Sequence, residues 1–204
     1  MNLLETALEG YFGKENLKKI QRVKVGIAGL GGLGSNCAMH LVRCGFRDFT
    51  LCDFDKVEAK NLNRQFYFLS QLGVLKTEAL KANLTQINPS LKLKLITEKL
   101  TEDNIGKVFC DRDVVVEAFD NASCKQMITC AYARSGKFFV SASGLAGWGR
   151  ADEIITRKVH KDFILIGDLK TEASAKFPPC SPRVAVAAAK QADSILFWVL
   201  GEAA

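Results

Sequence analysis

The sequence contains no run of about 20 apolar residues, the length that a membrane-spanning helix needs. Its first residues, Met1-Asn2-Leu3-Leu4-Glu5, include no basic segment, and Glu5 and Glu9 interrupt any signal-like apolar stretch. Pairs of the form C-x-x-C are also missing, so no structural zinc site is expected, although the chain has seven cysteines. An odd number of cysteines, most in apolar contexts, suits buried free thiols in a reducing compartment. These absences predict a cytoplasmic protein without a membrane partner.

Charge of one sign does not dominate the chain either. The net charge of +6 is modest and spread along the 204 residues, and 48% hydrophobic with 25% charged residues is ordinary for a globular protein. A solvated lysine-rich surface accounts for this charge, although it could also favour an acidic partner or a polyphosphate. We expect no nucleic-acid partner and a single domain over residues 1–204.

The most informative feature that is present is the stretch Gly29-Leu30-Gly31-Gly32-Leu33-Gly34. It follows an apolar run over residues 23–28 and opens a helix-like stretch over residues 35–44. A strand, a glycine-rich turn and a helix together bring backbone N–H groups onto a phosphate. Gly29 would allow the tight turn, Gly31 the close approach of the ligand, and Gly34 the packing of the helix on the strand. The stretch predicts a nucleotide site without specifying the nucleotide.

Alternating strand and helix patterns predict an α/β fold. We expect a Rossmann-like, mostly parallel sheet with helices on both faces and an antiparallel hairpin near the C-terminal part. Strands are predicted over 23–29, 49–52, 91–96, 114–116 and 138–141, and helices over 1–20, 34–44, 76–87, 102–109, 122–135 and 183–200. Residues 54–73 are predicted to be irregular, and residues 150–182 to form an edge hairpin (151–159 and 163–166) and a loop.

Two acidic residues follow predicted strands, Asp53 after the second and Asp120 after the fourth. Ligands of open parallel sheets bind at the carboxyl ends of the strands, where the glycine stretch also lies. Asp53 stands where an acidic residue takes the ribose hydroxyls of an adenine nucleotide. Up to this point an NAD-binding domain explains the pattern equally well.

Arg64 and Lys76 favour a triphosphate over a dinucleotide. Arg64 lies in the polar stretch Asn61-Leu62-Asn63-Arg64-Gln65, and Lys76 begins the next predicted helix. Each cation can neutralise phosphate oxygens as charge moves in a transition state. Asp120 is a candidate Mg²⁺ ligand, because magnesium often takes one carboxylate plus phosphate oxygens. These residues indicate nucleotidyl or phosphoryl transfer; the alternative is that Arg64 and Lys76 are surface residues and Asp120 caps a helix.

The ordered motifs resemble a known family. Residues 25–34 are followed by Leu51-Cys52-Asp53-Phe54-Asp55, then by residues 61–65, Gly73-Val74-Leu75-Lys76 and Asp120-Asn121. The order is similar to that in the adenylation domain of ubiquitin-activating-type enzymes, in the ThiF/MoeB family, and within it to the short forms of ThiF. The resemblance covers residues 22–144 and resumes weakly over 179–201. The set of motifs is far more specific than any one of them.

The resemblance implies a reaction and a site. The C-terminal glycine carboxylate of a small ubiquitin-like sulfur carrier protein ending in Gly-Gly would attack the α-phosphorus of ATP, in thiamine thiazole biosynthesis. Gly32 would lie against the phosphates with Gly29 and Gly31, and Asp53 on the ribose. The triphosphate would contact Asn61, Arg64, Gln65 and Lys76, and Asp120 would hold Mg²⁺ with Asn121 beside it. The family also suggests a homodimer.

The sequence departs from the family pattern in one important respect. The family commonly has an N-terminal arginine that reaches the partner subunit's ATP, whereas no arginine precedes Arg22 here. Lys14 could substitute, but as a point charge and not as a guanidinium fork. The departure puts a site shared between subunits in doubt.

Cys180 is a further candidate, as the thiol that receives the activated carrier. It lies between prolines with Lys176 and Arg183 near in sequence, and neighbouring cations favour a reactive thiolate. The alternative is a structural cysteine at a helix start. Trp148, with Phe138 and Phe139 upstream, either lines a groove for the carrier or packs in the core.

Three other functions stay open. An NAD-dependent oxidoreductase would use the glycine stretch and Asp53 alone. A non-catalytic scaffold would bind nucleotide and carrier without turnover, as the missing arginine allows. An adenylating enzyme could also act on another acceptor, such as a tRNA or a peptide tail.

Overall fold

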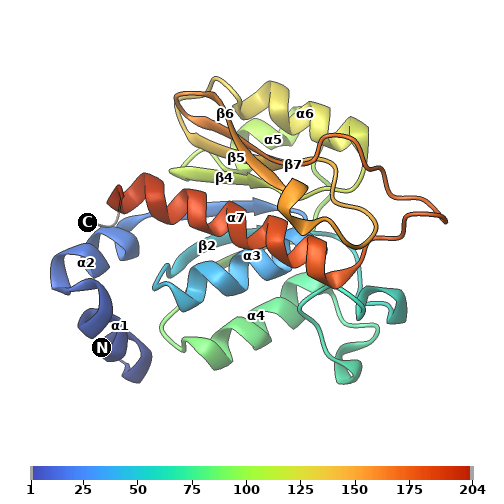
Figure 1. Ribbon diagram of the computed structural model, residues 1–204. Helices are drawn as coiled ribbons and strands as arrows, with labels where there is room; N and C mark the ends of the chain where they lie inside the picture. Colours follow the sequence, from blue (N-terminus) through green and yellow to red (C-terminus); the bar gives the residue numbers. More distant parts are fainter. Residues whose placement is uncertain (1, 203–204) are drawn as a thin grey trace.

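The computed structural model describes residues 2–202 and contains one seven-stranded sheet (Figure 1). The strand order is β3-β2-β1-β4-β5-β7-β6, and all pairs are parallel except β6 with β7. The strands are β1 (Lys24–Ala28), β2 (Asp48–Cys52), β3 (Lys92–Ile96), β4 (Val114–Glu117), β5 (Phe138–Ala142), β6 (Ile155–His160) and β7 (Phe163–Gly167). The predicted fold class, a mostly parallel sheet with one antiparallel hairpin, is confirmed.

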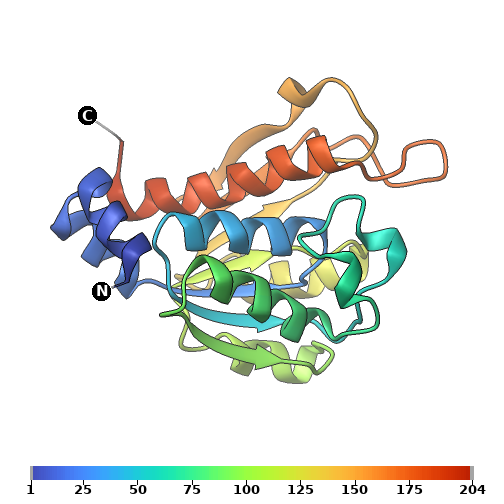
Figure 2. The same ribbon diagram turned by 90° about the horizontal axis from the view of Figure 1, so that it is seen from below.

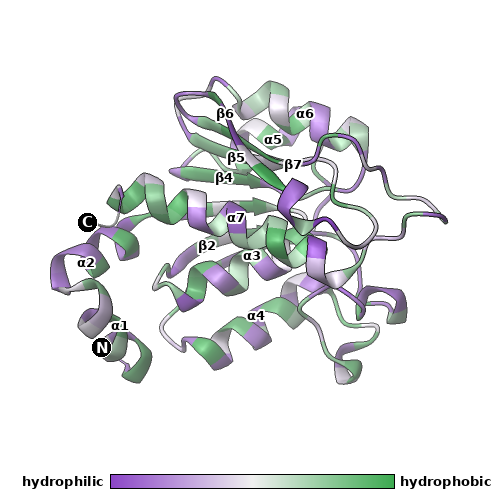
Figure 3. Ribbon diagram, viewed as in Figure 1, coloured by the Kyte–Doolittle hydropathy of each residue, from purple (hydrophilic) through white to green (hydrophobic). Residues whose placement is uncertain are grey.

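Helices cover both faces of the sheet. On one face α3 (Gly32–Arg43), α4 (Lys76–Ile87) and α7 (Ser181–Leu200) lie side by side, as Figures 1 and 2 show. On the other face lie α5 (Glu102–Val108) and α6 (Ala122–Tyr132), which pack on a second apolar cluster. The central strands β4 and β5 are entirely buried and hydrophobic in colour, while α2 carries polar residues (Figure 3). In the described part of the chain, no helix combines the length and apolarity that crossing a membrane requires.

The N-terminal segment differs from the prediction. Residues 1–20 were expected to form one helix, but the chain forms α1 (Leu3–Phe12) and α2 (Lys14–Arg22). Gly13 separates them with a φ of 75°, a left-handed conformation that a continuous helix does not permit. The Asn2 side chain caps α1 by accepting a hydrogen bond from the Glu5 N–H.

Three irregular segments gather at the carboxyl ends of the parallel strands. Residues 53–75, coloured teal in Figure 1, contain the short helices η1 (Ala59–Asn61) and η2 (Leu69–Gln71). Residues 143–154 contain η3 (Ala151–Glu153), and residues 168–180 lead into α7. Figures 1 and 2 place all three at the end of the sheet where α3 begins, so this edge is where a ligand site is expected.

Candidate functional site

The loop between β1 and α3 contains two glycines, Gly29 and Gly34, at positions where a side chain would overlap neighbouring backbone atoms. Gly29 has a φ of 89°, and a Cβ there would lie 2.9 Å from the Ala118 carbonyl oxygen. A Cβ on Gly34 would lie 1.9 Å from the Gly29 carbonyl oxygen. Only glycine therefore allows the tight turn and the close approach of α3 to the loop, as the sequence predicted for both positions.

Gly31 is different, because no protein atom would overlap a Cβ at this position. The nearest atom to a Cβ built there is Gln65 Nε2, at an ordinary contact distance of 3.7 Å, and its φ is −74°. The N-terminus of α3 begins beside it with no side-chain cap and no acidic residue in its first turn. Gln65 Oε1 is buried and has no hydrogen-bond partner among residues 2–202. An uncapped helix N-terminus suits an anion such as a phosphate.

The segment after η1 is locked against this loop by hydrogen bonds. The Phe66 N–H donates to Ser35 Oγ at 3.0 Å, and Asn36 Nδ2 donates to the Arg64 carbonyl at 2.9 Å. The Tyr67 hydroxyl donates to the Leu30 carbonyl at 2.8 Å. Burial raises the pKa of Tyr67 well above its usual value, so this hydroxyl stays a neutral donor.

Asp53 and Lys76 lie together beside the loop. Asp53 Oδ2 accepts a hydrogen bond from the Leu30 N–H at 2.7 Å and lies 3.7 Å from Lys76 Nζ. Lys76 Nζ also donates to Asp55 Oδ2 at 2.8 Å. Burial raises the pKa of Asp53, while Lys76 and two backbone N–H groups oppose that shift. Asp53, predicted to bind the ribose, and Lys76, predicted to bind the triphosphate, are thus adjacent, and Lys76 pairs with both Asp53 and Asp55.

Arg64 and Asn61 also lie at this edge, with their polar groups engaged locally. The Arg64 stem runs past Gly32, whose added Cβ would lie 3.4 Å from Arg64 Cγ. The Arg64 guanidinium donates to the Lys60 carbonyl at 3.1 Å and to Asn63 Oδ1 at 2.8 Å. Asn61 is buried and its Oδ1 accepts from the Glu58 N–H at 2.9 Å, so that oxygen caps η1.

Asp120 lies three residues after the end of β4, the strand beside β1 in the sheet, and its carboxylate is available for a ligand. Ala118, two residues before it, packs against Gly29 of the loop. Asp120 is exposed, and its carboxylate has no hydrogen bond or ion pair within the described range 2–202. Asn121 instead caps α6, since its Oδ1 accepts from the Ser123 N–H at 2.9 Å. Within that range no three His, Cys, Asp or Glu side chains form a metal-binding group. A single free carboxylate fits Mg²⁺ only where phosphate oxygens supply further ligands.

A pocket of about 250 Å³ lies between the segments that follow β5 and β7 and the first turn of α7. Its lining includes the exposed Trp148 together with Phe177, Arg150 and Lys170. The floor contains a buried ion pair, in which Arg183 donates to Asp168 at 2.5 Å. Phe138 and Phe139 are buried core residues and do not line it. Val184, which follows the lining residue Arg183 in α7, packs against the glycine loop, because its Cγ1 would lie 2.7 Å from a Cβ on Gly32.

Cys180 is the N-cap residue of α7 and is not among the residues that line this pocket. Its thiol donates to the Pro178 carbonyl at 3.4 Å, and the Gly147 N–H donates to the same carbonyl at 2.9 Å. The two cations expected beside Cys180 are engaged elsewhere. Arg183 pairs with Asp168, and Lys176 Nζ lies 5.6 Å from the Phe177 ring centroid.

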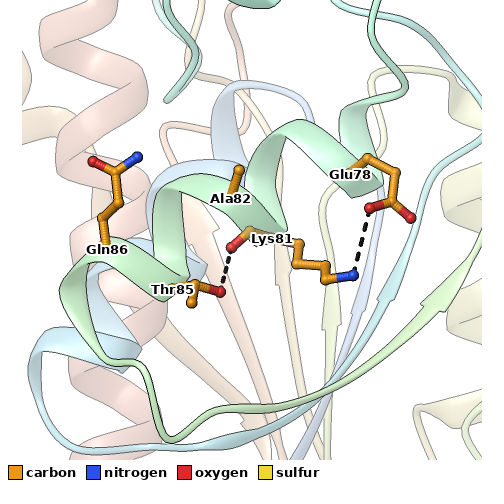
Figure 4. Close-up of a pocket in the computed structure, with 5 residues that line it drawn as sticks. All are labelled: Glu78, Lys81, Ala82, Thr85 and Gln86. Atoms are coloured by element: carbon orange, nitrogen blue, oxygen red, sulfur yellow. Dashed lines mark hydrogen bonds and ion pairs between the residues drawn. The ribbon is translucent and has the colours of Figure 1, made fainter.

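A second depression lies on α4 and belongs to no site. Glu78, Lys81, Ala82, Thr85 and Gln86 line it, and all five lie on one helix (Figure 4). Its polar side chains satisfy each other locally: Lys81 Nζ lies 3.6 Å from Glu78 Oε2, and Thr85 Oγ1 donates to the Lys81 carbonyl at 2.7 Å. No second element closes it, so it is the outer face of a surface helix.

Sequence reasoning missed three groups at this edge. Tyr67 binds the glycine loop, Asp168 and Arg183 hold the floor of the pocket, and Glu117 forms a buried ion pair with Lys125. The partners in each case lie on different elements, so no local spacing reveals the contact. The one available signal was a charged residue, Glu117, in an otherwise apolar buried strand.

Comparisons with known proteins match this architecture. A protein 33% identical over 141 residues is the adenylyltransferase and sulfurtransferase UBA4 of Lodderomyces elongisporus; the match covers 68% of this chain and 31% of that protein. The molybdopterin-synthase adenylyltransferase of Haemophilus influenzae is 34% identical over 112 residues, covering 54% of this chain and 46% of its own. This chain thus spans about a third to a half of the length of these relatives.

A solved structure shares the fold over nearly the whole chain. The E. coli tRNA N6-threonylcarbamoyladenosine dehydratase TcdA in complex with AMP superposes with a TM-score of 0.87, covering 96% of this chain and 93% of its own. The identity of 19% makes this a likeness of fold. The sequence model of the ThiF family matches residues 5–202, which is almost every residue of the chain. The chain belongs to the ThiF family.

Proposed function

We propose that this protein uses Mg-ATP to adenylate the C-terminal glycine carboxylate of a small ubiquitin-like sulfur carrier protein. The observation that carries the proposal is the space at Gly31, beside the uncapped N-terminus of α3 and the buried Asp53–Lys76 pair. The unpaired N–H groups at that helix N-terminus are suited to hold a nucleotide phosphate. Family membership supports ATP as the nucleotide, because several relatives are named adenylyltransferases.

In this reaction a carboxylate oxygen forms a bond to the α-phosphorus as the bond to the pyrophosphate oxygen breaks. The carboxylate is already ionised, so the protein needs no dedicated base. Its task is to bring two anions together and to neutralise their charge. The α3 N–H groups would hold the phosphates, and Asp53 would bind the ribose. Lys76 and Arg64 would exchange their present partners, Asp55 and Asn63, for phosphate oxygens.

Asp120 would hold Mg²⁺ against the triphosphate. The free and exposed carboxylate lies beyond Ala118, which contacts the glycine loop. When bound there, the ion supplies charge neutralisation on the phosphate oxygens. Asn121 supports the arrangement by capping α6 directly after Asp120.

The pocket over Arg183 is the proposed entry for the carrier tail. Its lining includes Arg183, whose chain neighbour Val184 packs against Gly32 of the glycine loop, and Trp148 and Phe177 offer apolar surface. Arg150 and Lys170 are cations that would attract the approaching carboxylate. Cys180 stays a candidate for a thioester with the carrier, in which the thiol sulfur displaces AMP.

The proposal is tested by exchange of labelled pyrophosphate into ATP, with a carrier ending in Gly-Gly. Asp120→Ala and Arg64→Ala are expected to lower exchange by at least about 100-fold while the fold survives, since each removes charge neutralisation in the transition state. Lys81→Ala, on the outer face of α4, is the matched control and keeps the wild-type rate. Wild-type exchange in Asp120→Ala or Arg64→Ala would contradict the role given to that residue.

A different acceptor is the second candidate. TcdA, named as a tRNA N6-threonylcarbamoyladenosine dehydratase, shares this fold over 93% of its own length. AMP formation that needs a tRNA or a peptide, and no carrier protein, would favour this alternative. Titration with ATP and with NADH separates both from an oxidoreductase, because Arg64 and Lys76 predict a preference for the triphosphate. The role in thiamine thiazole biosynthesis and the cytoplasmic location stay predictions.

A further inference from the structure

One buried charge pair at the carboxyl edge has no part in the chemistry above. Glu117, the last residue of β4, is 0% exposed, and its carboxylate lies 2.9 Å from Lys125 Nζ of α6. It lies three residues before Asp120 in the chain. A buried ion pair is weak evidence for stability, because desolvation of both charges offsets their attraction. Glu117 lies close in the chain to Asp120, the candidate Mg²⁺ ligand, so a role other than stability is considered for the ion pair.

The carboxylate of Glu117 and the ammonium of Lys125 are fully satisfied. Glu117 Oε1 accepts from the Phe119 N–H at 2.7 Å, and Oε2 accepts from Ser141 Oγ at 2.6 Å. Lys125 Nζ donates to both carboxylate oxygens, at 2.9 and 3.0 Å, and to the Ala142 carbonyl at 2.8 Å. All three ammonium donors are therefore used. The network joins β4, α6 and β5.

The same residue also anchors α7 and bends the chain. Gln191 Nε2 of α7 donates to the Glu117 carbonyl at 3.1 Å. The bond from the Phe119 N–H back to the Glu117 side chain turns the backbone directly after the strand. Asn121 then caps α6 on the far side of the turn. Asp120 lies between these two constraints, while its own carboxylate is free.

We propose that the Glu117–Lys125 ion pair is a positioning device that holds the turn carrying Asp120 in the geometry needed for the magnesium–triphosphate complex. Partners that orient a ligand carboxylate typically change metal affinity or activity about 10- to 100-fold when removed. The inference rests on the proposed function, because it assumes that Asp120 binds the nucleotide's metal. Glu117 and Lys125 are positioning residues and touch no substrate.

The test measures binding of a fluorescent ATP analogue as Mg²⁺ is titrated, together with the thermal unfolding temperature. Lys125→Met removes the cation, and we expect the half-saturating Mg²⁺ concentration to rise about tenfold or more. Lys125→Arg keeps a cation and is expected to restore part of that loss. Ser141→Ala removes one bond to Glu117 Oε2 and should give a smaller rise in a variant that still folds.

The matched control is a second buried pair at the opposite edge of the sheet. Arg112 is 7% exposed and donates to Asp48 at 2.6 Å, far from Asp120 along the strands. Arg112→Met is expected to lower the unfolding temperature and to leave the Mg²⁺ dependence unchanged. An unchanged Mg²⁺ dependence in folded Lys125→Met and Ser141→Ala would overturn the positioning role alone. Absence of Mg²⁺-dependent nucleotide binding in the wild-type protein would overturn the proposed function with it.

Discussion

Gly31 and Gly34 lie three residues apart in one loop, yet they lack a side chain for different reasons. A Cβ at Gly34 would overlap the Gly29 carbonyl, so the fold itself requires glycine there. A Cβ at Gly31 meets nothing closer than 3.7 Å in the protein. We propose that a ligand phosphate uses the space at Gly31.

Substitution at the two positions should separate folding from binding. Gly31→Ala is expected to change the free energy of unfolding by about 1 kcal/mol or less, while raising the Kd for ATP at least about tenfold. Gly34→Ala should destabilise the protein by more than about 3 kcal/mol, because backbone must move to relieve the overlap. Thermal unfolding and calorimetric titration with ATP measure the two effects. Wild-type ATP affinity in Gly31→Ala would remove the main support for the phosphate site.

At the scale of elements, the irregular segments after β5 (residues 143–154) and β7 (residues 168–180) are both tied to α7 by the buried Arg183 guanidinium. Arg183 NH2 donates to Asp168, and NH1 donates to the Gly149 and Arg150 carbonyls at 2.9 and 2.8 Å. Asp168 in turn accepts from the Lys170 and Thr171 N–H groups. The pocket proposed for the carrier tail is lined by both Arg183 and Asp168.

Removal of the Arg183 side chain should therefore loosen that end of the sheet. Arg183→Met is expected to cost about 3–5 kcal/mol in the free energy of unfolding, because Asp168 stays buried without its cation. Lys81→Ala, which removes an exposed pair with Glu78, should change it by less than about 0.5 kcal/mol. Urea unfolding of both variants measures the difference. A cost in Arg183→Met no larger than that in Lys81→Ala would contradict a structural role for the pair.

Elements with clear local signals could be predicted from the sequence. The helix over 76–87 has the predicted bounds, because Asn88-Pro89 stops it, and the parallel strands follow their apolar runs. The break at Gly13 was not predicted. The apolar residues keep helical spacing up to Phe12, and a single glycine in a sequence does not reveal that its φ is positive. The carboxylate partners of Lys76 and Arg183 were not predictable, since the fold and not the spacing brings them together.

At the scale of the whole molecule, buried thiol and phenol groups make the free energy of unfolding depend on pH. Burial raises the pKa of Cys52 and of Tyr132 to about 12, and that of the Cys37 thiol further. In the unfolded chain these groups titrate near pH 8.5 for cysteine and about 10 for tyrosine. Between about pH 8.5 and 12 the native state keeps protons that the unfolded state loses, so stability falls as pH rises.

Urea midpoints between about pH 8 and pH 11 test this linkage. We expect the midpoint to fall with pH in the wild-type protein and to fall less steeply in Cys52→Ala. That variant is less stable at every pH but has lost one linked proton. A midpoint that is flat or rises over this range would contradict the assigned burial of these groups.

The segment before α4 also bears on assembly. Five large apolar side chains are exposed there: Phe54, Phe68, Leu69, Leu72 and Val74. We propose that these exposed side chains contribute to the interface of the predicted homodimer. Leu69→Glu is expected to shift the protein toward monomer. Any fall in its unfolding temperature should be no larger than the loss of the dimer accounts for. Light scattering at several concentrations measures the shift, and an unchanged mass would place the interface elsewhere.

The proposed site spans the sheet edge, with the nucleotide at β1 and β2, Asp120 at the end of β4, and the carrier tail beyond β5 and β7. The most direct test is the intact mass of a carrier protein ending in Gly-Gly after incubation with this protein and Mg-ATP. The account predicts a carrier that has gained one AMP on its terminal carboxylate, with pyrophosphate released and no product from Asp120→Ala. A carrier of unchanged mass, beside wild-type protein that binds ATP, would contradict it.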